Sequence, residues 1–161
     1  MNQIPDLRIR TLVDLPADPG RDYVLYWMTS YRRCNWNYSL QRAVAWAGAL
    51  HKPLVVLEAL RCGYPWASDR IHHFVIQGMA DNAAALARKR VLYYPYVELE
   101  ADRGKGLLAA LAARSSVVVS DDFPCFFLPR MQGAAARQMS TRFELVDSNG
   151  ILPLRAAVPS M

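Results

Sequence analysis

The sequence lacks the short motifs that usually identify a reaction or a bound nucleotide. Gly104-Lys105-Gly106 has no third glycine and lies far from the first buried strand, so it does not form a dinucleotide-binding loop, and there is no P-loop. His72 and His73 are adjacent, so on a helix they point about 100° apart and do not chelate one metal ion. No serine lies in a nucleophile elbow. The residues therefore predict no catalytic group and no metal site.

Cysteine is scarce, and long apolar runs are absent. The three cysteines, Cys34, Cys62 and Cys125, lie far apart without a CxxC pair, which disfavours a zinc site and a disulfide framework. Such thiols are typical of a reducing cytoplasm. No run approaches the roughly 18 apolar residues of a membrane span, and residues 1–10 hold no apolar segment typical of a secretory signal. We therefore expect a cytoplasmic protein without a membrane partner.

The chain has 161 residues, a length that suits one compact domain. Its hydrophobic content of 53% with 20% charged residues is typical of a folded protein. The net charge of +5 permits contact with phosphates or nucleic acid. However, the positive residues are scattered in short groups such as Arg32-Arg33 and Arg88-Lys89-Arg90, and a solvated surface is the simpler explanation of each group.

The run Tyr23–Met28 is apolar on both faces, which indicates a strand buried on both sides. A polar loop follows, and Asn35 or Asn37 can cap the next helix, which Pro53 ends. Strand, loop and helix in this order open a parallel α/β unit. Four more runs predict strands: 54–58, 91–97 (with Pro95 pushing it toward an edge), 116–120 and 143–147. Helices are expected between them, near 37–52, 68–90, 107–111 and 130–139.

These elements predict an α/β fold, a Rossmann-like three-layer α/β/α arrangement around a doubly wound, mainly parallel five-stranded sheet. The expected strand order is 3-2-1-4-5, with Tyr23–Met28 in the centre. Residues 1–20 are expected to form an N-terminal arm or an edge strand, residues 21–150 the α/β domain, and residues 151–161 the start of an interdomain linker.

In this order the loops after Met28 and after Ser120 flank one crevice at the carboxyl ends of the strands, where ligands of open α/β sheets bind. Aromatic faces with cations and carboxylates suit a flat ligand with polar edges, such as a flavin or a deazaflavin. Core packing of the tryptophans, and a turn or helix cap at the two aspartates, explain the same residues without a ligand. The candidate contacts are Trp27, Met28, Thr29, Arg32, Arg33, Trp36, Asp121, Asp122 and Phe123.

Short runs with a characteristic order and spacing extend over residues 21–155. They are Tyr26-Trp27-Met28, Asn35-Trp36, Arg42-Ala43, Pro53-Leu54-Val55-Val56, Phe74, Gly78-Met79, Asp121-Asp122-Phe123, Val146-Asp147, Asn149 and Pro153. Together they resemble the N-terminal α/β domain of DNA photolyases, especially the class II branch. The sequence departs from that pattern in a shorter loop at 29–34 and in Pro124-Cys125-Phe126, where the family usually has Ser-Pro-Leu.

The resemblance implies a photolyase-like flavoprotein that repairs cyclobutane pyrimidine dimers with blue light. In such a protein the α/β domain holds an antenna chromophore (a deazaflavin, FMN or a folate) or supports the catalytic domain. A helical C-terminal domain of the same polypeptide binds FAD and flips the damaged dinucleotide out of the DNA. We expect this chain to stop near the linker and to have no repair activity alone, meeting damaged DNA only through the full-length protein.

Two alternatives remain open. The first is a free-standing α/β domain that binds a nucleotide or a flavin, as electron-transfer flavoproteins and universal stress proteins do. The second is a scaffold without a ligand, whose exposed apolar surface docks a partner or forms a homo-oligomer.

Overall fold

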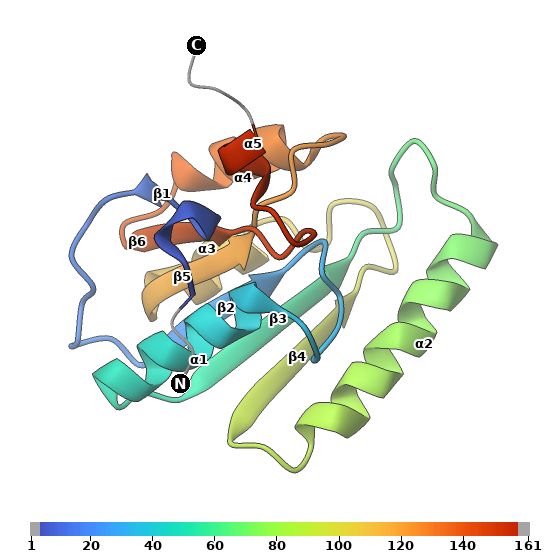
Figure 1. The fold of residues 1–161 in the computed structure, drawn as a ribbon. Coiled ribbons are helices and arrows are strands. Elements are labelled where there is room, and N and C mark those ends of the chain that lie inside the picture. Colours follow the sequence, from blue (N-terminus) through green and yellow to red (C-terminus); the bar gives the residue numbers. More distant parts are fainter. Residues whose placement is uncertain (1–3, 158–161) are drawn as a thin grey trace.

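The computed structural model describes residues 4–157, in which a six-stranded sheet lies between two layers of helices (Figure 1). The strand order across the sheet is β1-β6-β5-β2-β3-β4. The strands are β1 (Ile9–Val13), β2 (Tyr23–Met28), β3 (Leu54–Leu60), β4 (Val91–Val97), β5 (Ser115–Asp121) and β6 (Arg142–Val146). The helices are α1 (Tyr38–Leu50), α2 (Asp69–Leu86), α3 (Leu107–Ala113), α4 (Leu128–Ala136) and α5 (Leu154–Ala157).

The five strands from β2 to β6 pair in parallel in the predicted order, with β2 between β3 and β5. The doubly wound α/β fold is therefore confirmed. The predicted count of five strands is one short, because β1 pairs antiparallel with β6 and extends the sheet. Residues 9–13 thus form the edge strand that was one of the two expectations for the N-terminal segment.

Strand β4 lies at the opposite edge, as Pro95 predicts. Proline has no backbone N–H to donate, so an edge position tolerates it where a central strand does not. Pro95 pairs in register with Glu58 of β3, and the strand continues past it to Val97.

Side-chain caps begin the two longest helices. The Asn37 side chain accepts a hydrogen bond from the backbone N–H of Leu40 at 2.9 Å, so Asn37 rather than Asn35 caps α1. The Ser68 side chain accepts from the backbone N–H of Ile71 and caps α2, as predicted. Helix α4 begins at Leu128 and ends at Ala136, earlier at both ends than the predicted 130–139.

The core has two layers, one on each face of the sheet. Alternate residues of β2 point to opposite faces, so Tyr26 packs under α1 while Leu25 packs against α3 and α4. Both faces are covered over the central strands, which explains why the run Tyr23–Met28 has no polar alternation.

The predicted linker, residues 151–161, contains the short helix α5. Residues 158–161 lie outside the described residues, as do residues 1–3 of the N-terminal arm. Within the described part of the chain no helix is long and apolar enough to cross a membrane.

Candidate functional site

The loop after β2 and the end of β5 meet directly, through the carboxylate of Asp121. This side chain is fully buried. Its Oδ2 atom accepts hydrogen bonds from the backbone N–H groups of Thr29, Ser30 and Tyr31 at 2.9, 2.7 and 3.0 Å. Its Oδ1 atom accepts from the Tyr26 hydroxyl at 2.7 Å. A carboxylate at the predicted switch point therefore binds the adjacent loop instead of facing an open crevice.

Asn37 connects the same loop to α1. Its side-chain amide donates to the Tyr26 hydroxyl at 2.9 Å and to the carbonyls of Tyr31 and Arg33, both at 3.0 Å. Burial and, after it, the charge of Asp121 raise the pKa of Tyr26 well above its ordinary value of 10.0. The hydroxyl therefore stays protonated, donating to Asp121 while it accepts from Asn37.

Glu58, at the carboxyl end of β3, forms a second buried polar cluster. It accepts hydrogen bonds from Arg32 Nη1 at 3.1 Å, Asn82 Nδ2 at 2.9 Å and the Tyr93 hydroxyl at 2.7 Å. Arg32 also donates to the carbonyl of Ala59 at 2.7 Å. Burial and the bond to Glu58 raise the pKa of Tyr93, so it too remains a donor. Every group in this cluster has a partner within the protein.

The predicted contacts Trp27 and Met28 lie in the hydrophobic core and do not line a crevice at the strand ends. Trp27 packs near Phe143, with 6.4 Å between the ring centroids. Met28 is fully buried on the other face of the sheet. Core packing, one of the two interpretations of Trp27, agrees with this placement.

The remaining predicted contacts divide between the loop and solvent. Phe123 meets the Tyr31 ring edge-on at 6.2 Å between centroids, and the Tyr31 hydroxyl donates to the carbonyl of Asp122 at 3.2 Å. The guanidinium of Arg33 lies over the Tyr31 ring, 5.4 Å from its centre. Trp36, with a positive φ of 51°, is 91% exposed. The structure thus gathers Thr29, Arg33, Asp121, Asp122 and Phe123 around Tyr31 and leaves Trp36 in solvent.

Sequence reasoning missed Tyr26, Asn82 and Tyr93, which complete the two polar clusters. Tyr26 lies inside an apolar run, where a tyrosine is indistinguishable from a core aromatic residue. Asn82 could have been predicted from the sequence. It falls three residues after Met79 on the apolar face of the helix, and a single amide buried there needs a hydrogen-bond partner.

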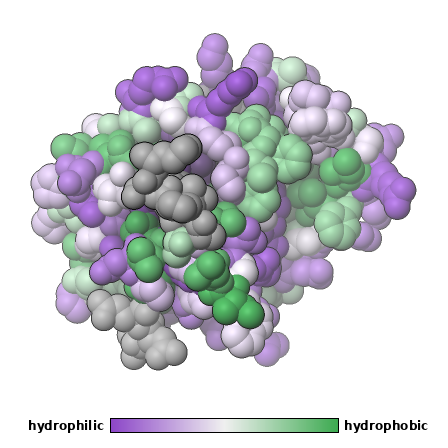
Figure 2. All heavy atoms as spheres, turned by 45° about the horizontal axis from the view of Figure 1, so that its top comes forward, coloured by the Kyte–Doolittle hydropathy of each residue, from purple (hydrophilic) through white to green (hydrophobic). Residues whose placement is uncertain are grey.

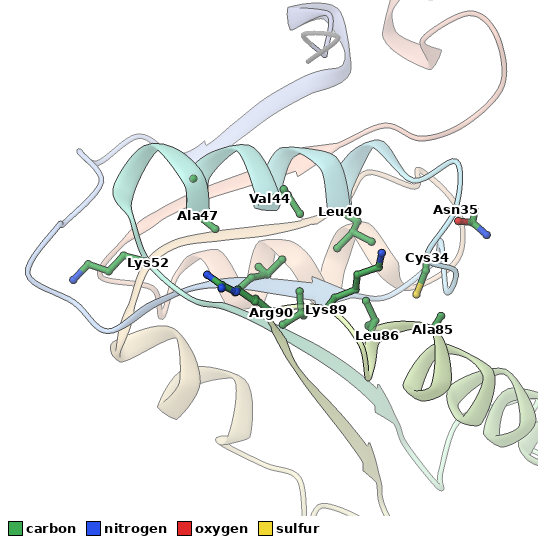
Figure 3. Close-up of a pocket in the computed structure, with 13 residues that line it drawn as sticks. Cys34, Asn35, Leu40, Val44, Ala47, Lys52, Ala85, Leu86, Lys89 and Arg90 are labelled. Atoms are coloured by element: carbon green, nitrogen blue, oxygen red, sulfur yellow. The ribbon is translucent and has the colours of Figure 1, made fainter.

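A groove lies between α1 and α2 (Figure 3), and at one end its lining residue Cys34 contacts Asn82 of the Glu58 cluster. Its volume of about 540 Å³ falls within the range of small-molecule sites. None of the nine predicted contacts lines it. The lining is Cys34, Asn35, Leu40, Val44, Ala47, Gly48, Lys52, Leu54, Ala85, Leu86, Lys89, Arg90 and Val91.

Metal binding has no support from the geometry. Within residues 4–157 no three histidine, cysteine or acidic side chains converge on a point that could hold an ion.

No family model matches this chain. It is 29% identical over 150 residues to a deoxyribodipyrimidine photo-lyase of Methanothermobacter thermautotrophicus. The match covers 93% of this chain but only 33% of that protein, so the chain spans about a third of the length of the relative.

Among solved structures, a universal stress protein in complex with cAMP has a TM-score of 0.43 and 18% identity, over 81% of this chain and 100% of that one. A universal stress protein family member from Burkholderia pseudomallei has a TM-score of 0.44 and 18% identity, over 74% of this chain and 93% of that one. Likeness at this level does not bear on function. The sequence as a whole is thus similar, over nearly its full length, to one third of a photolyase.

Proposed function

We propose that this chain is the N-terminal α/β domain of a photolyase-like flavoprotein for light-driven repair of cyclobutane pyrimidine dimers. The observation that carries the proposal is the 29% identity to a deoxyribodipyrimidine photo-lyase across 93% of the chain. Repair chemistry would belong to a helical FAD-binding domain of the same polypeptide, and damaged DNA would be bound there. The domain described here would pack against that helical domain or hold an antenna chromophore for it.

The polar clusters favour a supporting role over a chemical one. Asp121 and Glu58 are fully buried, and their carboxylates accept bonds from side chains and backbone of the domain itself. Groups held this way fix the loop after β2 and the start of α1, but they are not free to act on a substrate. An antenna such as a deazaflavin, FMN or a folate would have to rest on the outer side of that loop, against Arg33, Trp36 and Phe123.

Exposed aromatic side chains on the loops after β3 and β5 are evidence that a partner docks on this surface. The rings of Trp66 and Phe126 meet edge-on, 5.7 Å apart, although the two side chains are 58% and 71% exposed. Phe127 and Phe74 are exposed as well. Hydrophobic side chains also form patches between hydrophilic ones on the face seen in Figure 2. Apolar surface of this kind usually marks an interface, which here would receive the helical domain.

Expression from the complete gene tests the proposal. The purified protein should show flavin absorption, and under blue light but not in the dark it should split cyclobutane pyrimidine dimers in DNA back into the two separate pyrimidines. A flavin-free protein without light-dependent repair would refute the photolyase assignment.

Ligand titration of the domain separates the alternatives. Binding of FMN or a deazaflavin would support an antenna role, and weakening by Trp36→Ala would place the ligand on the loop of Tyr31. Binding of ATP or AMP alone would instead favour a free-standing nucleotide-binding domain. Association without any ligand would favour the scaffold.

A further inference from the structure

We propose that the groove between α1 and α2 binds a small organic anion that has a flat apolar body and one phosphate, sulfonate or carboxylate group. The proposal does not depend on kinship with photolyases, because the groove shares no residue with the predicted contacts at the strand ends. It rests on the shape of the groove, its apolar walls and the charges at its rim.

The groove exists because the two helices diverge and the residues facing it are small. Helix α2 lies beside the outer strand β4, apart from α1 (Figure 1). On α1 the wall contains Ala47 and Gly48, and on α2 it contains Ala85. A Cβ atom added at Gly48 would meet no atom within 4 Å outside the backbone of its own helix, so the space next to this residue is open.

The walls and floor are apolar. Leu40 and Val44 of α1 face Leu86 of α2 across the groove, and Leu54 and Val91 form its floor at the beginnings of β3 and β4. Val44 is partly exposed, whereas Leu54 and Leu86 are buried. A ring system inserted here would remove apolar surface of both partners from water.

Three cations line the same groove: Lys52, Lys89 and Arg90. Within residues 4–157 neither Lys89 nor Arg90 forms an ion pair, and Lys52 acts only weakly on Asp18. Figure 3 shows Lys89 and Arg90 extending into the space under α1. Cations after a helix end are expected for the helix dipole alone, but that role does not require them to face a cavity. Unpaired cations beside an apolar groove complement a ligand that is apolar with a single anionic group.

No nucleophile in the groove suggests a reaction. Cys34 lies at the far end, where burial and the nearby Glu58 raise the pKa of its thiol and its Sγ atom donates to Asn82 at 3.3 Å. A thiol held protonated is a poor nucleophile. The groove is therefore a binding site and not a catalytic one.

Two dyes that share an aromatic body test the proposal. Anilinonaphthalene sulfonate carries the anion, and N-phenylnaphthylamine is nearly the same body without charge. Both fluoresce on transfer from water to an apolar site, so their dissociation constants follow from titration. We expect the sulfonate to bind about tenfold more tightly than the amine, and this difference to shrink in high salt.

Variants locate the binding. Gly48→Trp should fill the groove and abolish binding of both dyes, whereas Gly48→Ala, which also replaces glycine within the helix, should leave binding unchanged. Lys89→Gln with Arg90→Gln should weaken the sulfonate about tenfold and leave the amine unaffected, while Arg88→Gln, outside the groove, should change neither. Circular dichroism of each variant confirms that it folds.

Equal affinity of the two dyes, or sulfonate binding that survives Gly48→Trp, would overturn the proposal, as would no binding at all. If sulfonate binding survives Gly48→Trp, the dye binds elsewhere, for example on the exposed aromatic side chains near Trp66. None of these outcomes touches the photolyase assignment, which the flavin content and repair activity of the full-length protein decide separately.

Discussion

Arg42 on α1 donates two hydrogen bonds to the fully buried carboxylate of Glu144 on β6, at 2.7 and 3.0 Å. Arg142 and the indole N–H of Trp46 donate to the same carboxylate, at 2.7 and 2.9 Å. A charge removed from water is stable only with such partners, and these attach α1 to the strand that also pairs with the antiparallel edge strand β1.

This cluster predicts how stability depends on pH. Burial alone would raise the pKa of Glu144, but the bonds from Arg42, Trp46 and Arg142 together outweigh it and hold the pKa below its ordinary value of 4.5. The folded state therefore binds the proton more weakly than the unfolded chain. The stabilisation is complete above about pH 4.5 and is lost as the pH falls through the lower pKa of the folded protein.

Glu144→Gln should lower the free energy of unfolding at neutral pH by about 3 kcal/mol, because it leaves two guanidinium groups beside a neutral amide. The variant should also lose less stability than the wild type between neutral and acidic pH. Urea denaturation at several pH values measures both effects. Glu100→Gln is the control: Glu100 is exposed and pairs with the equally exposed Arg103, so its loss should change stability by less than about 0.5 kcal/mol.

Asp121→Asn should loosen the loop after β2. The amide oxygen of asparagine cannot replace both carboxylate oxygens, so some of the N–H groups of Thr29, Ser30 and Tyr31 or the hydroxyl of Tyr26 lose their acceptor. We expect a loss of about 3 kcal/mol and faster amide hydrogen exchange at residues 29–31. Unchanged protection of these three amides would contradict the role assigned to Asp121.

Tyr26→Phe removes one hydroxyl that joins Asp121 to Asn37. Asp121 Oδ1 then loses its donor while it stays buried, whereas the Asn37 amide keeps its bonds to the carbonyls of Tyr31 and Arg33. The expected cost is about 2 kcal/mol in thermal or chemical unfolding. Tyr23→Phe is a matched control on the same strand: the Tyr23 hydroxyl donates only to the Leu111 carbonyl at 2.8 Å, and its loss should cost about 1 kcal/mol. Equal effects of the two substitutions would argue against a cooperative network around Asp121.

The exposed aromatic pair predicts self-association of the isolated domain. At high concentration the domain should form dimers or larger species in light scattering, and Trp66→Ser with Phe126→Ser should reduce them, because each substitution removes apolar surface from the patch. Trp36→Ser serves as the control, since Trp36 is at least as exposed but belongs to a different loop. A wild-type domain that stays monomeric under these conditions would contradict the assignment of this surface as an interface.

The sequence by itself determined the five parallel strands, their order in the sheet and the cap of α2, and it narrowed the cap of α1 to Asn35 or Asn37. These features depend on local patterns. The uninterrupted apolar run of β2 indicates a strand covered on both faces, and an asparagine at 35 or 37, or Ser68, before an amphipathic segment indicates a helix start. The right-handed crossover rule then leaves few topologies, and the predicted order of the parallel strands is confirmed.

Only the tertiary structure decided which polar side chains meet. Asp121 and Thr29 are separated by 92 positions in the chain, and Glu58 and Asn82 by 24, yet each pair forms a buried hydrogen bond or shares a buried cluster. Their position at the end of the central strand predicted that Trp27 and Met28 line a crevice. In the structure the alternation along β2 places them in opposite layers of the core. Apolar periodicity specifies which face of an element is buried, but a hydrogen bond also requires the register, depth and direction of both partners, and those are fixed only when the elements pack together.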